Sequence, residues 1–303
     1  MNSKWIGAAT LLLIASFPAA ALADEDLYHR ARASLVQLVA AGTEDGYYFG
    51  SGVTLPGGNV VTSCHVTQRA TRVKPFSGRS GLRADSQRAD VLHDLCLLHI
   101  PGLSMRPAEL ASSRNLRIGD KVYAFGFNGG RSLTYHAGEV SALFDYDDGM
   151  VIRTTAAFAQ GASGGGLFDE QGRLVGILTF YRVGGETAYF AVPVEWLQNV
   201  EQAPSDGIKP LDGVPFWAAS LERQPAFLRA DVLEADERWE ELIAFARAWT
   251  QSDPQDSHAW HALAKAAIKV GDHATAETAL KQASAHGNAD HPSGAFVAPS
   301  LDH

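Results

Sequence analysis

Cysteine, positive charge and long apolar runs are all scarce in this sequence. The 303 residues include two cysteines, and 25 Lys and Arg stand against 34 Asp and Glu, a formal net charge of −9. An acidic chain argues against nucleic acid as the partner. After residue 23 no apolar run approaches the roughly 20 residues that cross a bilayer, so we expect no membrane span in the mature chain.

The first 23 residues have the pattern of a secretory signal peptide. Lys4 precedes an apolar run over residues 5–17, and small residues stand at Ala21 and Ala23. The pattern predicts cleavage after Ala23 and export to the periplasm or the medium. The alternative is an uncleaved membrane anchor, for which the run is short.

The rest of the chain divides into two compositions. Residues 24–200 form one predicted domain, in which short β-rich runs alternate with Gly, Asp, Asn and Pro, as in an all-β barrel or sandwich. A Pro- and Gly-rich linker is expected over 201–216, helices over 217–290 and a tail over 291–303. The predicted strands are 34–40, 47–55, 59–62, 91–100, 121–127, 138–143, 151–155, 174–181 and 187–192.

The helical part resembles tetratricopeptide repeats. Residues 257–283 carry large and small apolar residues at helical spacing around Gly271. Stepping back by the 34-residue period of that repeat gives a second, degraded copy, in which Ala226 replaces Trp260. The alternative is an ordinary helical hairpin followed by one repeat. Two copies are too few for a freestanding array, so we expect them to lean on the β domain or on another subunit.

A serine within a glycine-rich loop is the first candidate for catalysis. In the sequence Gln160-Gly-Ala-Ser-Gly-Gly-Gly-Leu-Phe168, backbone N–H groups of Gly161 and Ser163 could stabilise an oxyanion formed when Ser163 attacks a carbonyl. Glycine-rich turns are common, however, and taken alone this loop could equally be structural.

A base and an orienting acid precede this serine. His65 follows the apolar run 59–62, and Asp94 opens the apolar run 95–100, with Asp90 as a competing carboxylate. The order His, Asp, Ser is that of chymotrypsin, and differs from that of subtilisin and of the α/β-hydrolases.

The flanking sequences resemble trypsin-like serine proteases, and within them the bacterial HtrA type, over residues 30–200. The segments that carry the resemblance are VVTSCHV around His65, HDLCLLHI around Asp94 and GASGGGLF around Ser163. The resemblance does not extend to a PDZ domain, because the C-terminal part resembles helical repeats instead. The resemblance implies a mainly β double six-stranded barrel of the chymotrypsin type, followed by an α-helical tetratricopeptide-like domain. It also implies that His65 is the general base, Asp94 its orienting acid and Ser163 the nucleophile, with an oxyanion hole at Gly161 and Ser163. No metal or cofactor is expected.

Two departures from the digestive members of the family concern control and specificity. Ala162 stands where an Asp accepts the new N-terminus on zymogen cleavage, so the loop must be ordered by its own packing or by a partner. Ala157 stands where an acid selects Lys or Arg. The resemblance therefore implies an uncharged specificity pocket that prefers an apolar residue before the scissile bond, with walls from Ala157, Phe158, Leu178, Thr179 and Phe180.

The two cysteines flank the base and the acid, since Cys64 precedes His65 and Cys96 lies two residues after Asp94. If His65 and Asp94 touch, a Cys64–Cys96 disulfide would join the two segments, which suits an exported protein. The alternative is two buried free thiols. Cys64 is a poor candidate nucleophile, because the glycine loop surrounds Ser163.

Four side chains of the second repeat copy stand at positions that line the inner groove of tetratricopeptide repeats. His258, His261, Lys265 and Lys269 would make a mildly basic groove for an acidic segment of a partner protein. The histidines are also spaced for shared metal ligation, but no third ligand is placed convincingly, so surface residues are the simpler interpretation.

The sequence thus predicts an exported serine endopeptidase that acts on polypeptides, with a helical region that docks a partner or substrate. Two alternatives stay open. A catalytically silent protease fold could serve as a scaffold or binding protein, and the same site chemistry would permit a serine esterase of broader range.

Overall fold

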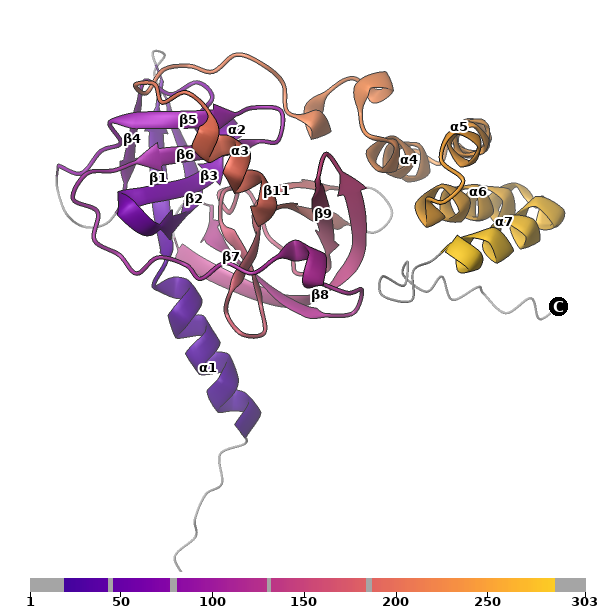
Figure 1. Ribbon diagram of the computed structural model, residues 1–303, viewed down its shortest axis with the longest axis horizontal. Helices are drawn as coiled ribbons and strands as arrows, with labels where there is room; N and C mark the ends of the chain where they lie inside the picture. Colours follow the sequence, from indigo (N-terminus) through magenta and orange to yellow (C-terminus); the bar gives the residue numbers. More distant parts are fainter. Residues whose placement is uncertain (1–18, 43–45, 77–80, 130–131, 184–186, 287–303) are drawn as a thin grey trace, which may run out of the picture.

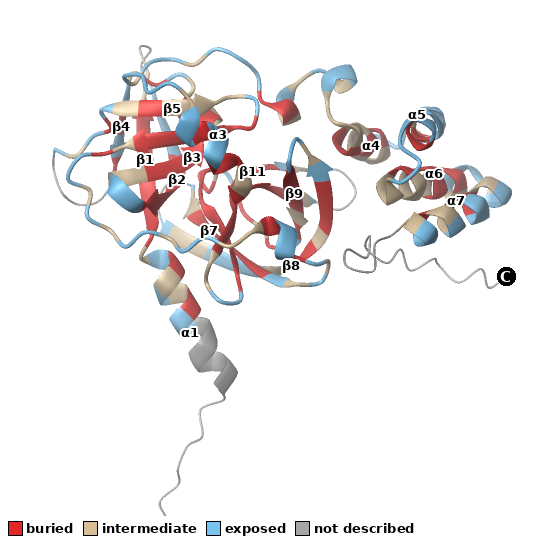
Figure 2. Cartoon of the chain, in the orientation of Figure 1, coloured by how far each residue is buried: buried red, intermediate tan, exposed pale blue. Residues whose placement is uncertain are grey.

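A computed structural model describes residues 19–42, 46–76, 81–129, 132–183 and 187–286, with side chains from residue 25 onward. Two six-stranded antiparallel sheets lie side by side, and a group of helices packs beside the second (Figure 1). This arrangement confirms the predicted mainly β double barrel followed by helices. Buried residues concentrate on the strands of both sheets and on the inner faces of the helices (Figure 2).

The first sheet carries the predicted base and acid. Its order is β4-β1-β2-β3-β6-β5, and within the described residues β4 and β5 remain open edges, so this barrel is incompletely closed. Apolar side chains from both halves of the sheet, among them Leu38, Val60 and Leu98, fill its interior. The strands are β1 (Leu35–Ala41), β2 (Tyr47–Leu55), β3 (Asn59–Ser63), β4 (Arg72–Pro75), β5 (Ser86–Asp90) and β6 (Leu95–His99).

The second sheet closes into a barrel in the order β10-β11-β12-β9-β8-β7 and carries the glycine-rich loop before β10. Its core includes Val122, Ile152 and Leu178. The strands are β7 (Lys121–Asn128), β8 (Ser132–Tyr146), β9 (Gly149–Thr154), β10 (Gly166–Asp169), β11 (Leu174–Arg182) and β12 (Ala188–Pro193).

Three strands, β4 (Arg72–Pro75), β5 (Ser86–Asp90) and β10 (Gly166–Asp169), were not predicted from the sequence, for identifiable reasons. β4 is short, β5 reads Ser-Gln-Arg-Ala-Asp with one apolar residue, and β10 begins inside the glycine run. Their partners place them in the sheets, because β5 pairs along the whole of β6 and β10 lies between β7 and β11. Local propensity is weak in all three, so tertiary pairing decides them.

A helix that the sequence did not predict, α1 (Ala19–Arg32), precedes the first barrel. Leu27 and Ala31 are buried, and the Tyr28 ring lies 6.0 Å from Phe125 and 5.3 Å from Tyr135 of the second barrel. Most of the predicted signal peptide lies outside the described residues. Within the part of the chain that the structure describes, no helix is both long and apolar enough to cross a membrane.

The segment predicted as a linker, residues 201–216, is packed against the protein for much of its length. After α3 (Leu197–Gln202), residues 203–225, here called the strap, run along the first barrel. Asp206 exchanges two backbone hydrogen bonds with Gln87 of β5 at 2.8 and 3.0 Å, and the Leu211 amide donates to the Gln68 carbonyl at 2.8 Å. Phe216, in the short 3-10 turn η4 (Phe216–Ala218), is 2% exposed.

Four helices follow as consecutive antiparallel pairs, namely α4 (Ala226–Ala235), α5 (Trp239–Ser252), α6 (Ser257–Val270) and α7 (His273–His286). The Asp256 side chain caps α6 by accepting the His258 amide at 2.9 Å, and Gly271 ends it with φ +80°. The Phe227 ring of α4 stacks at 4.3 Å on Phe144 of β8. The helices therefore lean on the second barrel, while their assignment as tetratricopeptide repeats stays a prediction.

Candidate active site

The glycine-rich loop is wedged between the two barrels, which explains its composition. A Cβ on Gly164, whose φ is +82°, would lie 2.2 Å from both the Ser51 carbonyl oxygen and the Thr62 Oγ1. A Cβ on Gly165 would lie 2.2 Å from the Phe125 carbonyl oxygen. Contacts this short are sterically forbidden, so only glycine fits at these two positions.

Ser51, which sequence reasoning missed, fastens this loop to the first barrel. Its amide donates to the Ser163 carbonyl at 2.8 Å, and its hydroxyl donates to the Gly161 carbonyl at 2.8 Å. The same hydroxyl accepts the Phe127 amide at 2.9 Å. Ser51 is fully buried, so these bonds are sheltered from competition by water. A serine between two glycines on β2 was the available signal.

The amides of the loop fall into two groups. Those of Ala162, Gly164 and Gly165 donate to protein carbonyls at 3.0, 2.8 and 2.8 Å. Among the described hydrogen bonds of residues 161–165, the amides of Gly161 and Ser163 make none, and Gly161 has φ +95°. Ala162 is fully buried. The amides of Gly161 and Ser163 therefore have no protein acceptor among the described hydrogen bonds, and their role as an oxyanion hole stays a prediction.

His65 and Asp94 form the most tightly defined pair in the site. His65 lies in the short helix α2 (Cys64–Thr67), which starts as β3 ends, and Asp94 occupies the turn between β5 and β6 with φ +59°. The His65 Nδ1 lies 2.7 Å from the Asp94 Oδ2, and the His65 amide donates to Oδ1 at 2.8 Å. Asp94 is fully buried. The carboxylate therefore fixes both the backbone and the ring of the histidine.

Two further side chains donate to the same Asp94 oxygen. The Thr179 Oγ1 lies 2.6 Å from Oδ2, and the Trp217 Nε1 lies 3.1 Å from it. The Trp217 ring also meets the His65 ring edge to face, with centroids 5.6 Å apart. Trp217 was missed because it lies 123 residues from Asp94, at the first residue of the region predicted as helical repeats.

The charge of Asp94 controls the protonation of His65. Burial of the imidazole by itself lowers the pKa of His65, but the charge of Asp94 and the hydrogen bond to it outweigh burial and raise that pKa above 6.5. Asp90, the competing carboxylate, is committed elsewhere, since its Oδ2 lies 2.6 Å from the His93 Nδ1.

Ser163 and Asp94 are linked through one residue. The Ser163 hydroxyl donates to the Thr179 carbonyl at 3.2 Å, while the Thr179 hydroxyl donates to Asp94 at 2.6 Å. Ser163 is half-buried. The structure thus brings the three predicted residues to one place, where the second barrel meets the first.

The predicted disulfide is confirmed. Cys64 and Cys96 are bonded, with Cα atoms 4.8 Å apart, and both are buried. The bond joins the residue before His65 to β6, two residues beyond Asp94. It therefore ties together the two segments that carry the base and the acid.

Most of the side chains predicted to wall the specificity pocket are buried, and a pocket formed by these residues stays a prediction. Leu178 is fully buried in the core of the second barrel, and Thr179 is 2% exposed with its hydroxyl committed to Asp94. Phe158 packs on Tyr189 within that core, and Phe180 stacks on Trp217 at 5.1 Å. The pairing of β11 with β12 shifts register between Leu178 and Tyr181, so Thr179 and Phe180 lie at an irregularity of the strand. Ala157 alone is half-exposed, and an uncharged pocket beside it stays a prediction.

The four groove residues also lie differently from the expected free basic groove. The His258 Nε2 lies 2.8 Å from the Leu143 carbonyl oxygen of β8, and its ring packs 4.6 Å from Phe144. Lys265 pairs with Glu234, and Lys269 lies 5.5 Å from the Trp239 ring. Burial lowers the pKa of His258 and of His261.

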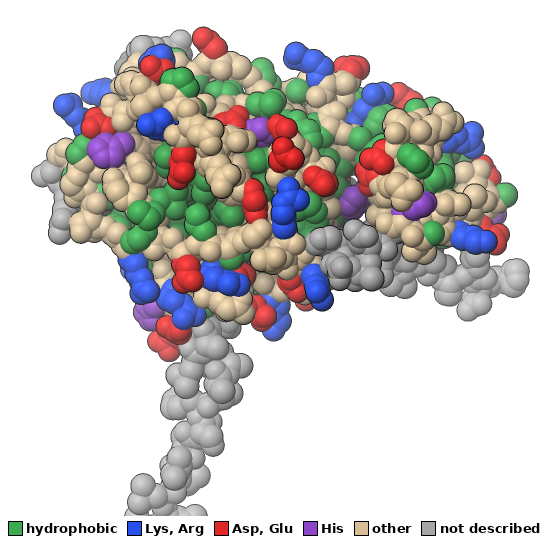
Figure 3. All heavy atoms as spheres, in the orientation of Figure 1, with side chains coloured by type: hydrophobic (Ala, Val, Ile, Leu, Met, Phe, Trp, Pro, Cys, Tyr) green, Lys and Arg blue, Asp and Glu red, His purple; other side chains and the backbone are tan. Residues whose placement is uncertain are grey.

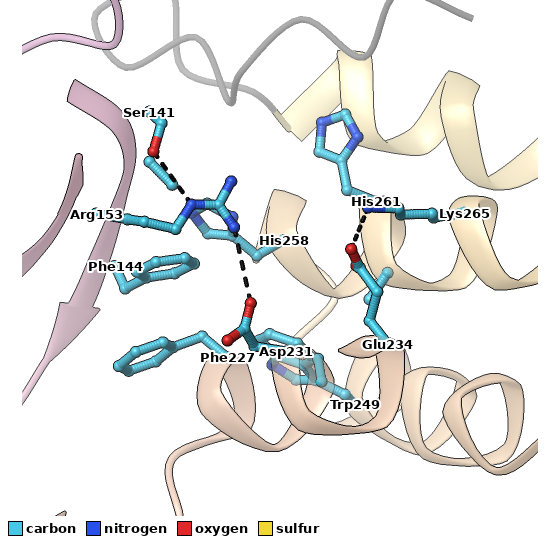
Figure 4. Close-up of a pocket in the computed structure, with 13 residues that line it drawn as sticks. Ser141, Phe144, Arg153, Phe227, Asp231, Glu234, Trp249, His258, His261 and Lys265 are labelled. Carbon is cyan, nitrogen blue, oxygen red and sulfur yellow. Dashed lines mark hydrogen bonds and ion pairs between the residues drawn. The ribbon is translucent and has the colours of Figure 1, made fainter. Parts of the chain in front are cut away.

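His258, His261 and Lys265 line a pocket of about 180 Å³ between the second barrel and the helices, where both signs of charge meet (Figure 4). Arg153 of β9 points across it to Asp231 of α4, with Nη1 3.9 Å from Oδ1, and Ser141 accepts from Arg153 at 3.2 Å. The basic groove is thus replaced by a mixed, internally paired interface.

The face of the molecule in Figure 3 carries acidic and basic side chains interspersed. Among the residues that the structure describes, no group of three or more His, Cys, Asp or Glu side chains is placed to hold a metal ion.

Comparison with known proteins agrees with this geometry. Residues 50–177 match the trypsin-like peptidase domain. The chain is 37% identical over 159 residues to a periplasmic serine endoprotease DegP-like protein of Ectopseudomonas mendocina, covering 50% of this chain and 34% of the relative. It is 30% identical over 163 residues to the serine protease HhoB of Synechocystis sp., covering 50% and 39%. The chain therefore spans well under half the length of these relatives.

Solved structures give the same picture. The HtrA-type protease AlgW with a tripeptide is 30% identical at a TM-score of 0.52, covering 59% of this chain and 62% of that one. The serine endoprotease from Yersinia pestis is 27% identical at 0.53, covering 59% and 65%. A protease from M. tuberculosis, 19% identical at 0.56 over 70% and 99%, shares the fold. This chain therefore contains a trypsin-like peptidase domain of the kind found in HtrA-type and DegP-like serine proteases.

Proposed function

We propose that the protein is an exported serine endopeptidase that hydrolyses polypeptides through Ser163, His65 and Asp94. The observation that carries the proposal is the shared contact through Thr179. The Thr179 hydroxyl donates to the buried Asp94 carboxylate, and the Thr179 carbonyl accepts the Ser163 hydroxyl. The Asp94 Oδ2 also lies 2.7 Å from the His65 Nδ1. The similarity to serine endoproteases supports peptide bonds as the substrate.

The resting position of the serine defines the first step. Because the Nδ1–H of His65 is held by Asp94, its Nε2 is left as the proton acceptor. The Ser163 hydroxyl turns from the Thr179 carbonyl toward that nitrogen, gives up its proton and attacks the substrate carbonyl. The amides of Gly161 and Ser163 stabilise the oxyanion. His65 then returns the proton to the leaving amine, and water hydrolyses the acyl-enzyme by the same route.

Location and docking belong to the same proposal. The relatives named as periplasmic and the Cys64–Cys96 disulfide support an oxidising compartment outside the inner membrane. The signal peptide over residues 1–23 would supply the export. For the helical region we propose protein docking, on the faces that α4 and α6 do not use against the barrel, since stacked helical pairs bind extended partners on such surfaces.

A fluorophosphonate probe and casein test the chemistry together. Wild type should be labelled and should cleave casein, whereas Ser163→Ala should do neither while keeping its far-UV spectrum. Folded wild type that shows neither reaction would support the scaffold alternative. Labelling and ester hydrolysis without casein cleavage would support an esterase, and in both cases the endopeptidase proposal would be withdrawn.

A further inference from the structure

We propose that Trp217 is a positioning residue of this active site, so that the strap completes a site otherwise built by the two barrels. The inference rests on the proposed function for its kinetic consequences. Its structural content, an indole held against the acid and the base, stands independently of it. The strap would then link catalytic competence to the position of the chain that leads into the helices.

The contact is specific in chemistry and in direction. An indole Nε1–H can only donate, so its bond to the Asp94 Oδ2 at 3.1 Å supports the ionised carboxylate. It is the third donor to that oxygen, with His65 and Thr179. The ring also lies edge to face against His65. One side chain therefore limits the movement of both partners of the pair.

The indole has a fixed seat on the second barrel. Its ring stacks on Phe180 at 5.1 Å with an interplanar angle of 18°, and Phe180 stacks on Phe190 at 4.5 Å and 10°. The Trp217 carbonyl accepts the Gln224 Nε2 at 3.1 Å. Three aromatic rings in a row leave the indole little freedom to tilt.

The strap is anchored beside the catalytic segments themselves. The Phe216 amide donates to the Leu92 carbonyl at 2.9 Å, two residues before Asp94. Gln68, three residues after His65, accepts the Leu211 amide at 2.8 Å and donates its Nε2 to the Gly213 carbonyl at 2.9 Å. These hydrogen bonds hold the backbone around Trp217 against the first barrel, while stacking on Phe180 holds its ring against the second barrel.

The electrostatic consequence has a definite sign. Without the indole N–H, the Asp94 charge is less compensated, so it attracts the protonated imidazole more strongly and raises the pKa of His65 further. The acid limb of kcat/KM should therefore move to higher pH. The ring also loses its lateral support, so kcat should fall, by about tenfold for a bond to a charged group. A purely structural role would leave the position of the acid limb unchanged.

The test uses the full chain and three variants. Trp217→Phe keeps a stackable ring and removes the donor, and Trp217→Ala removes both. Trp260→Phe is the matched control, because its indole donates to the Pro254 carbonyl at 2.9 Å within the helical region. We expect both Trp217 variants to lower kcat and Trp217→Phe to shift the acid limb upward, with Trp260→Phe unchanged. Identical pH profiles for Trp217→Phe and wild type would overturn the inference.

An NMR measurement separates this inference from the proposed function. In ¹⁵N-labelled protein, the Trp217 indole Nε1–H resonance, assigned by its loss in Trp217→Phe, should move upfield in Asp94→Asn, whereas the Trp260 resonance should stay. If wild type proved inactive, the proposed function would fail while this shift would still support the contact. If wild type is active but the Trp217 indole resonance does not shift in Asp94→Asn, the inference about Trp217 is refuted while the proposed function is retained.

Discussion

Replacement of Ser51 by alanine should damage both the stability of the domain and the nucleophile loop. The hydroxyl donates to the Gly161 carbonyl at 2.8 Å and accepts the Phe127 amide at 2.9 Å, and Ser51 is fully buried. The substitution removes both bonds at a position that solvent does not reach.

The magnitude follows from these two orphaned groups. A buried polar group left unsatisfied costs about 1–3 kcal/mol, and Phe127 is only half-buried, so a loss of about 2–4 kcal/mol in the free energy of unfolding is expected. Part of the loss falls on function, because Gly161 carries one of the two free amides. Its reorientation should slow fluorophosphonate labelling by about 10²-fold, the scale of losing one oxyanion donor.

Urea unfolding and the labelling rate measure the two effects separately. Ser34→Ala is the matched control, since Ser34 is equally buried and donates one bond, to the Ala31 carbonyl at 2.9 Å, away from the loop. It should lose about 1 kcal/mol and keep its labelling rate. A Ser51→Ala variant within about 0.5 kcal/mol of wild type, labelled at the wild-type rate, would refute the reasoning.

Three further predictions concern the disulfide and two histidines. The double variant Cys64→Ala/Cys96→Ala opens a loop of about 33 residues (64 to 96 inclusive) and should lose about 3–4 kcal/mol of unfolding free energy in urea, against no change if the bond contributes nothing. Because Asp94 raises the pKa of His65, and the neutral imidazole is the active form, kcat/KM should fall on acidification with an apparent pKa above 6.5. Asp94→Asn should move that limb to lower pH, and an unmoved limb would contradict the assignment. Burial lowers the pKa of His93, but the carboxylates of Asp90 and Asp147, at 2.6 and 2.8 Å from its ring nitrogens, outweigh burial and raise that pKa above 6.5. The stabilisation from these ion pairs is therefore complete below the pKa of His93 in the unfolded chain and is lost as the pH rises through its pKa in the folded protein. His93→Gln should therefore destabilise the protein more at about pH 5.5 than at about pH 9, and equal losses at both would exclude the linkage.

The sequence by itself determined what depends on local chemistry and chain order. Alternating apolar runs defined the long strands, and the order of His65, Asp94 and Ser163 with their flanks identified the peptidase domain. Cys64 and Cys96 were paired correctly because Cys64 is next to His65, Cys96 is close to Asp94, and the predicted chemistry requires His65 and Asp94 to be in contact.

Only the tertiary structure decided how distant segments meet. The Thr179 hydroxyl donates to Asp94, 85 residues earlier in the chain, at an irregularity of β11 that no alternation pattern could anticipate. The His258 ring is hydrogen-bonded to the Leu143 carbonyl because the helices pack on β8, and these two residues are 115 apart in the sequence. Trp217 reached Asp94 because its segment pairs with the first barrel through backbone groups, which carry no side-chain signature in a sequence. Local propensity and motif spacing can be read from consecutive residues. These contacts join residues that are far apart in the sequence, so they depend on how the two barrels and the strap pack against one another.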